Sequence, residues 1–263
     1  MNPLTIYQVD AFTNHLFGGN PAAVVPLSKW LPDAILQNIA MENNLAETVY
    51  IVPSSLSDFH IRWFTPSIEV RLCGHATLAA AHVLWQHLGF LRQNVSFDSL
   101  SGVLKVEKKE KGYTLDFPTD VLEDGESARD IIEAVLKIKP LRIFKGKDDY
   151  MAILSHQEDI EALKPDFKPL KNLSARGLIV TALGNNVDFV SRCFYPEAGV
   201  EEDPVTGSAH TTMMPFWAER LGKTILQAQQ LSARKGDLTC ELRGDRVLIT
   251  GEAVTYMRGE VFI

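Results

Sequence analysis

Two segments of the chain repeat each other in order, and this repeat constrains the fold more than any other feature. Residues 58–66 read DFHIRWFTP and residues 188–196 read DFVSRCFYP, so Asp, Phe, Arg, Phe and Pro recur 130 positions apart. GHATLAAAHVLWQHLG from Gly74 faces GSAHTTMMPFWAERLG from Gly207, 133 positions apart, and both segments close on Leu-Gly. A short insertion before Gly207 accounts for the difference in spacing. The repeat predicts two similar units descended from one ancestral unit.

Each copy has the same order of local signals. An alternating strand ends at a proline, a loop and a glycine follow, and then comes a helix. Residues 75–88 are apolar on nearly every side, which predicts a buried helix. Gly89 and Gly222 are suited to ending the two helices. Pro215 lies inside the second helix and predicts a kink or a loosened turn there.

The rest of the chain reads as strands joined by tight turns. The fold class we predict is α+β with two duplicated domains, each a curved, mainly antiparallel, barrel-like sheet around a central helix. The acidic, proline-containing stretch from Pro118 to Ser127 predicts the boundary between them. We therefore expect halves at residues 1–118 and 119–263. The last strand, around Arg258 to Ile263, is a candidate to return to the first domain.

Composition and charge exclude several classes of function. Hydrophobic residues make up 46% and charged residues 22%, a globular mixture. The net charge of -7 argues against a nucleic-acid partner, which needs a basic surface. No apolar run reaches membrane-spanning length and no targeting segment is recognisable. Three widely spaced cysteines predict reduced thiols, and we expect a cytoplasmic protein.

The two repeated glycines mark a candidate site. If both helices start just after them, two helix N-termini face each other across a cleft between the domains. Unpaired N–H groups at such ends suit a carboxylate or a developing enolate oxygen. The alternative is that Gly74 and Gly207 only permit tight turns. Cys73, His75, Asp203 and Ser208 cluster around them in the sequence, and this favours a site.

Four blocks of the sequence resemble the PhzF-like isomerases, in that family's order and over nearly the whole chain. They are DAFTNHLFGGNPAAVV (10–25), NLAETVYIV (44–52), RWFTPSIEVRLCGHATLAAAHVL (62–84) and GVEEDPVTGSAH (199–210). The resemblance implies the diaminopimelate-epimerase-like fold. It also implies a cofactor-free isomerase that shifts a proton, with double-bond migration, on a small carboxylate-bearing substrate. The family's best-known reaction is the isomerisation of trans-2,3-dihydro-3-hydroxyanthranilate in phenazine biosynthesis. A homodimer is compatible with the resemblance, although no interface stripe is identifiable.

The resemblance also implies roles for individual residues. Glu47 would be the general acid/base, with His75 and Asp203 as further catalytic groups. The substrate contacts would be Asn20, Cys73, Gly74, Gly207 and Ser208. Lys235 stands where relatives often have glycine, which bears on the pocket but not on proton transfer.

A comparison with the epimerases that share this fold narrows the chemistry. In those enzymes a cysteine precedes the glycine of each half, and the two thiols act as opposed bases. This chain keeps Cys73 but has Thr206 at the second position. A threonine hydroxyl is too weak an acid for two-base racemisation near neutral pH. A one-base proton shift is what remains.

Each residue also has a plainer interpretation. Glu47 could be a surface carboxylate that pairs with an arginine, and His75 and Asp203 could serve only the helix starts. Cys73 could be a small buried hydrophobe. His82, His87 and His210 lack metal-ligand spacing, so no metal is expected. Two rival functions stay open: a racemase, epimerase or lyase that uses Glu47 with Cys73, and a non-enzymatic protein that binds a metabolite or a partner.

Overall fold

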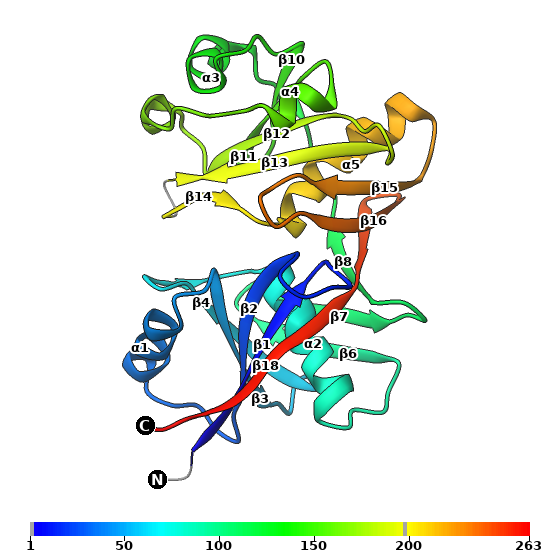
Figure 1. Ribbon diagram of the computed structural model, residues 1–263. Helices are drawn as coiled ribbons and strands as arrows, with labels where there is room; N and C mark the ends of the chain where they lie inside the picture. Colours follow the sequence, from blue (N-terminus) through cyan, green and yellow to red (C-terminus); the bar gives the residue numbers. More distant parts are fainter. Residues whose placement is uncertain (1–2, 197–198) are drawn as a thin grey trace. The chain divides into compact units, whose positions relative to one another are not determined.

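The computed structural model describes residues 3–196 and 199–263 and divides the chain into two compact units. Unit 1 is Met1–Asp116 with Thr250–Ile263, and unit 2 is Phe117–Ile249. Each unit combines a mainly antiparallel sheet with a few helices, as Figure 1 shows, so the predicted α+β class is confirmed. Among the residues described, no helix is both long and apolar enough to cross a membrane.

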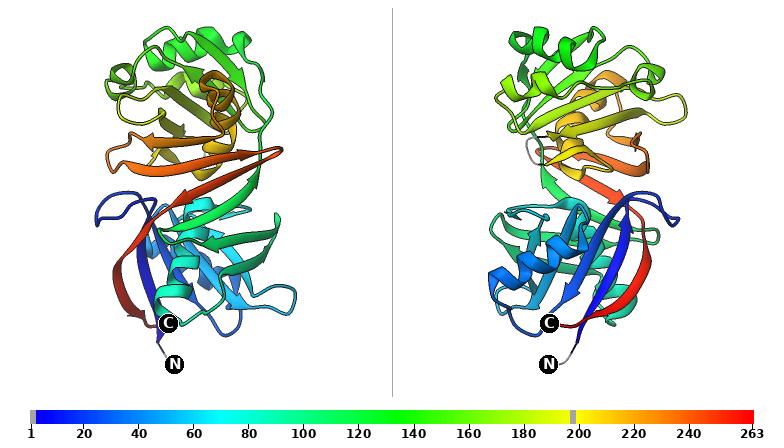
Figure 2. Two further views of the ribbon diagram at one scale, coloured as in Figure 1. Left: turned by 90° about the vertical axis from the view of Figure 1, so that its right-hand side faces the viewer. Right: turned by 60° about the vertical axis from the view of Figure 1, so that its left-hand side comes forward.

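In the part of unit 1 that the structure describes there are nine strands and two helices. The strands are β1 (Leu4–Ala11), β2 (Asn20–Pro26), β3 (Glu47–Pro53), β4 (Phe59–Phe64), β5 (Glu69–Val70), β6 (Asn94–Ser99), β7 (Gly102–Lys108), β8 (Tyr113–Pro118) and β18 (Ala253–Val261). The helices are α1 (Asp33–Asn43) and α2 (Gly74–His87). Antiparallel pairs alternate with two parallel ones, β2 with β3 and β4 with β6. Figure 2 shows the first and last strands, β1 and β18, side by side, and they pair antiparallel.

Strands β2 and β3 are apolar along their length because both faces of the sheet are covered. Ala23 and Val25 of β2 share a cluster with Leu36 and Ile39 of α1, so that helix covers one face. The alternate residues of these strands, such as Val24 and the residues flanking Tyr50, are also buried and point the other way, where α2 packs.

The central helix of unit 1 is confirmed. The sequence predicted a buried helix at 75–88, and α2 runs from Gly74 to His87 with every residue from His75 to Trp85 buried. Its composition explains the burial, because its alanines leave space for the sheet to wrap closely around it.

Unit 2 repeats this plan. Its strands are β9 (Glu123–Asp124), β10 (Arg142–Lys145), β11 (Asp149–Ile153), β12 (Gly177–Leu183), β13 (Phe189–Tyr195), β14 (Val200–Asp203), β15 (Ile225–Gln230), β16 (Gly236–Arg243) and β17 (Arg246–Gly251). Its helices are α3 (Arg129–Leu136), α4 (Gln157–Glu161) and α5 (Gly207–Leu221), with short 3₁₀ helices at Glu126–Ala128 and Lys168–Asn172. Helices α3 and α4 contribute to an apolar cluster with β12 and β13. Helix α5 occupies the other face, where Trp217 Nε1 donates to Thr181 Oγ1 over 3.0 Å.

The duplication is visible in the strand pairings. In unit 1 the order is β2 parallel to β3, β3 antiparallel to β4, and β4 parallel to β6. In unit 2 the same order runs through β11, β12, β13 and β15. The two repeat arginines also make the same contact, since Arg62 and Arg192 each hold a glutamate, Glu69 or Glu202, through two hydrogen bonds of 2.7–2.8 Å.

Helix α5 contains Pro215, and the kink or loosened turn expected there stays a prediction. It continues through Pro215 as one helix from Gly207 to Leu221. It ends at Gly222, which adopts a left-handed conformation with φ of 64°, as the sequence indicated.

The last segment of the chain belongs to unit 1. Strand β18 pairs with β1 from Leu4 opposite Val261 to Ala11 opposite Ala253. The chain therefore passes from unit 1 to unit 2 near residue 116 and returns to unit 1 near residue 250. The assignment of residues 1–118 and 119–263 as the two ancestral halves stays a prediction.

Acid should destabilise unit 1 through His82. Burial lowers the pKa of His82 to about 4, and the ring contacts Tyr113 and Thr255. The unfolded chain takes up this proton below about pH 6.5, whereas the folded chain resists until about pH 4. We therefore expect the free energy of unfolding to fall by up to about 3 kcal/mol between these pH values because of this one group.

Denaturant unfolding at several pH values checks this. The His82→Gln variant, which cannot titrate, should lose less stability on acidification than the wild type. Substitution of an exposed histidine, His156→Gln, should leave the wild-type pH dependence unchanged. An equal loss in His82→Gln and wild type would contradict the assignment.

Candidate functional site

Four of the residues singled out in the sequence converge at the start of α2 in unit 1. Asn20 and Glu47 are the first residues of β2 and β3, which run parallel. The starts of adjacent parallel strands lie at one edge of a sheet, so both side chains reach the same place. Cys73 is the residue that precedes α2, and His75 lies in its first turn.

The His75 ring is the centre of this group. Its Nε2 lies 3.0 Å from Glu47 Oε2, which is the distance of an ion pair. The angles at this contact do not meet those of a hydrogen bond. Its Nδ1 lies 3.1 Å from Asn20 Nδ2 and 3.4 Å from Cys73 Sγ. An asparagine amide has a donor end and an acceptor end, so Asn20 can serve the ring with or without a proton on Nδ1.

The electrostatics of the pair favour a charged histidine. Burial opposes the charge on His75, but the neighbouring Cys73 and Glu47 favour it, and its pKa is raised well above the usual value. Burial and the Glu47 charge raise the pKa of the Cys73 thiol to about 11, so the thiol keeps its proton at neutral pH. The anion that faces His75 at neutral pH is therefore Glu47.

The Glu47 carboxylate is only partly available to a substrate. Its side chain is 17% exposed, and Oε2 is buried against His75. The exposed part of the carboxylate is therefore the side that carries Oε1. Glu47 lies at the start of a strand and pairs with a histidine, not with an arginine.

The same group has the donor atoms of a metal site. One ligand atom each from Glu47, Cys73 and His75 lie within 4.8 Å of one another, and this is the metal-capable cluster found among the residues described. The sequence search considered His82, His87 and His210 and did not recognise this combination, because a strand and a helix supply its members.

The remaining predicted residues gather at the start of α5 in unit 2. Thr206 precedes α5 as Cys73 precedes α2, which confirms that the two positions correspond. Its hydroxyl donates to Asp203 Oδ2 over 2.6 Å, and its backbone N–H donates to Gln230. Gly207 and the half-buried Ser208 are the first two residues of the helix.

Arg176 was missed by the sequence analysis. Its Nη2 lies 3.3 Å from Ser208 Oγ, and its guanidinium forms two hydrogen bonds with Asp149, which is only 2% exposed. The signal that could have found it is the internal repeat. The strand pairs β3–β4 and β12–β13 can be aligned on the repeated Phe64 and Phe194. In that alignment Glu47 corresponds to Gly177, the residue that follows Arg176.

The position of unit 2 that corresponds to Glu47 is Gly177, and its surroundings leave no space for a side chain. A Cβ atom added at Gly177 would lie 2.2 Å from the Tyr195 ring and 2.4 Å from the Phe194 carbonyl oxygen. An acidic side chain at this position would clash with Tyr195 and Phe194, so at these two matching positions only unit 1 carries an acid.

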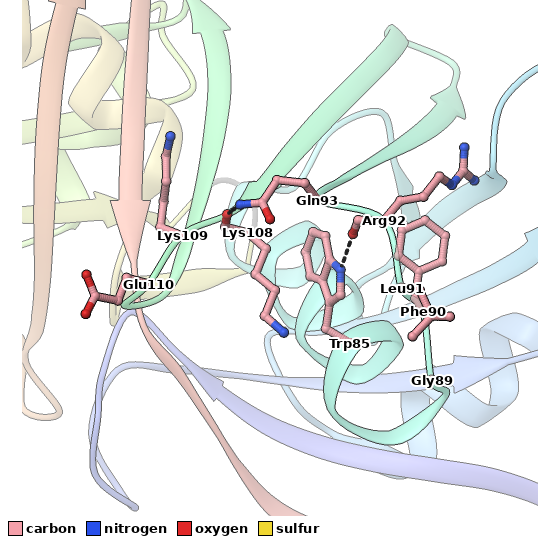
Figure 3. Close-up of a pocket in the computed structure, with 9 residues that line it drawn as sticks. All are labelled: Trp85, Gly89, Phe90, Leu91, Arg92, Gln93, Lys108, Lys109 and Glu110. Carbon is pink, nitrogen blue, oxygen red and sulfur yellow. Dashed lines mark hydrogen bonds between the residues drawn. The ribbon is translucent and has the colours of Figure 1, made fainter.

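A separate hollow lies toward the other end of α2. Figure 3 shows its lining, in which Trp85 Nε1 donates to the Arg92 carbonyl oxygen over 2.8 Å. The hollow measures about 450 Å³. Helix rise puts Trp85 about 15 Å from His75 along the axis. None of the predicted site residues lines it.

The chain forms two similar α+β units, and unit 1 pairs a buried histidine with a glutamate at a helix start. The chain belongs to the PhzF family: the model of the family described as phenazine biosynthesis-like protein (PhzC-PhzF) matches residues 9–259.

Related proteins match this chain over nearly its whole length. An uncharacterized isomerase of Pseudomonas aeruginosa is 49% identical over 260 residues, which cover 99% of each chain. The crystal structure of a PhzF-family phenazine biosynthesis protein from Enterococcus faecalis superposes with a TM-score of 0.91 at 44% identity and full coverage of both chains. A hydroxyproline epimerase from Agrobacterium vitis has a TM-score of 0.64 at 11% identity, covering 98% of this chain and 92% of its own, and so shows the fold alone.

Removing the Glu47 charge should lower the pKa of His75. The Glu47→Gln variant keeps the shape of the side chain but no longer offers a negative charge 3.0 Å from Nε2. Titration of the His75 ring by NMR in wild type and variant checks this. Glu69→Gln, a change at a glutamate that pairs with Arg62, is the matched control and should leave the His75 pKa in place. An unchanged His75 titration in Glu47→Gln would show that another group holds the proton.

Proposed function

We propose that this protein is a cofactor-independent isomerase that shifts a proton, with double-bond migration, on a small carboxylate-bearing substrate. The reaction would be similar to that of trans-2,3-dihydro-3-hydroxyanthranilate isomerase. Glu47 is the general acid/base. The observation that carries the proposal is the contact between the partly exposed Glu47 carboxylate and the buried His75 ring at a helix start.

The proton moves in two steps. Glu47, through Oε1, removes a proton from a carbon adjacent to a conjugated, carboxylate-bearing system. The electron pair spreads over that system, and Glu47 returns the proton to another of its carbons. Positioned acid/base groups of this kind contribute about 10²–10⁴-fold in rate.

His75 supports both steps. Its positive charge offsets the negative charge that develops on the substrate, and its ring fixes the orientation of the carboxylate. The first N–H groups of α2, near Gly74, have no partner within the helix and suit a substrate oxygen. Asp203 stays a predicted catalytic group, and Gly207 and Ser208 stay predicted substrate contacts. Asn20 is placed to act through His75.

A two-base racemase is disfavoured by the groups that would have to act. Cys73 is a buried thiol that keeps its proton at neutral pH, because its pKa is raised to about 11. The Thr206 hydroxyl is occupied by Asp203, and Gly177 leaves no room for a second acid. A single base, Glu47, is consistent with proton transfer between two carbons of one substrate. The naming of a close relative as an isomerase weighs against a protein that only binds a metabolite.

Proton NMR in deuterated buffer tests the proposal. The wild type is incubated with a panel of cyclic and amino-acid carboxylates that includes trans-2,3-dihydro-3-hydroxyanthranilate. We expect double-bond migration in the wild type and in Glu69→Gln, and a loss of about 100-fold or more in Glu47→Gln.

The outcomes separate the alternatives. Migration that survives Glu47→Gln would contradict the role of Glu47. Deuterium incorporation without migration would favour the racemase, and folded protein that leaves the whole panel unchanged would favour a binding protein. The homodimer and the cytoplasmic location stay predictions.

A further inference from the structure

Cys73 is a buried group that the proposed proton transfer does not use. Its side chain lies beside the reacting pair, with Sγ 3.4 Å from His75 Nδ1 and 4.0 Å from Nε2. Glu47 Oε2 is buried there as well and lacks a well-aligned hydrogen bond. A sulfur, a nitrogen and an oxygen donor therefore converge from one strand and one helix start.

We propose that Glu47, Cys73 and His75 form a binding site for a thiophilic divalent cation, typified by Zn²⁺, and that the bound ion blocks proton transfer by Glu47. The binding claim is independent of the enzyme's reaction. The inhibition claim rests on the proposed function.

The distances are close to those of a zinc site. Zn²⁺ binds sulfur at about 2.3 Å and nitrogen or oxygen at about 2.0–2.2 Å, so tetrahedral ligands lie about 3.3–3.6 Å apart. Here Oε2 and Nε2 are 3.0 Å apart, Nε2 and Sγ are 4.0 Å apart, and no pair exceeds 4.8 Å. Sγ lies nearer Nδ1, at 3.4 Å, so binding of the ion at Nε2 requires the Cys73 side chain to turn toward that nitrogen.

The charges balance when the ion binds. The Cys73 thiol gives its proton to solvent and binds as thiolate, and any proton on His75 Nε2 leaves in the same way. The thiolate and the Glu47 carboxylate then neutralise the two charges of Zn²⁺, which offsets the unfavourable positive end of α2. Three protein ligands leave a fourth position for water.

Asn20 supplies the outer contact that a metal-bound histidine needs. When Nε2 binds the ion, the ring proton sits on Nδ1 and requires an acceptor. The Asn20 amide lies 3.1 Å from Nδ1, and rotation about its last bond presents oxygen instead of nitrogen.

Cobalt(II) titration of the full-length protein tests the site, since the thiolate-to-cobalt charge-transfer band reports a Cys–metal bond directly. Wild type and Cys240→Ser, a change at a buried cysteine in β16, should each show the band at one equivalent. Cys73→Ser should lose it, and the affinity for Zn²⁺, measured by competition with a chromophoric chelator, should fall by about 100-fold or more.

A second variant guards against misfolding. If Cys73→Ser does not fold, as judged by circular dichroism, Glu47→Gln should weaken Zn²⁺ binding while keeping the charge-transfer band. Wild type without a band, or equal Zn²⁺ affinity in wild type and the ligand variants, would overturn the proposal. Once a substrate is turned over, Zn²⁺ should inhibit wild type and Cys240→Ser alike, and binding without inhibition would overturn only the inhibitory role.

Discussion

The contact between Glu47 and His75 is the interaction on which the account of this protein depends. The His75 side chain is only 5% exposed, so a positive charge on its ring is costly in free energy. The Glu47 carboxylate 3.0 Å away offsets this cost. Sheet register places the carboxylate, because Glu47 begins β3 beside Asn20 at the start of β2. The apolar helix α2 places the ring, because its burial fixes where the first turn lies. The pairing of β2 with β3 and the burial of α2 together set the distance between Glu47 and His75.

The duplicated units show how one architecture carries unequal chemistry. Both units repeat the strand pairings, the arginine–glutamate pair and a helix that starts after a polar residue. Among the residues described, the pairing of a glutamate with a buried histidine at a helix start is found in unit 1. In unit 2 the position that corresponds to Glu47 is Gly177, which lies against the Tyr195 ring. The residue that corresponds to Cys73 is Thr206, which donates a hydrogen bond to Asp203. Two units with the same strand pairings therefore carry different groups at corresponding positions, a glutamate and a histidine in unit 1 and a glycine and a hydrogen-bonded threonine in unit 2.

Much of this architecture could be read from the sequence. Strand alternation, the prolines and the paired Leu-Gly ends located β4, β13, α2 and α5, because these signals are local. The proposed role of Glu47 in proton transfer came from the resemblance, since no periodicity distinguishes Glu47 from a surface glutamate. Side-chain contacts could not be predicted. The approach of Cys73 to His75 and the contact of Arg176 with Ser208 depend on register and rotamers that only the three-dimensional structure supplies.

The central claim is that a single carboxylate carries one proton between two carbons of the same molecule. A substrate found in the panel, deuterated at the carbon that loses its proton, tests this in ordinary water under single-turnover conditions. Part of the deuterium is expected at the new carbon of the product, because Glu47 is only partly exposed and returns the isotope before solvent replaces it. The contrary result is a product free of deuterium that forms faster than the unreacted substrate loses its deuterium to solvent. It would show that a second group delivers the proton and would contradict transfer by one base.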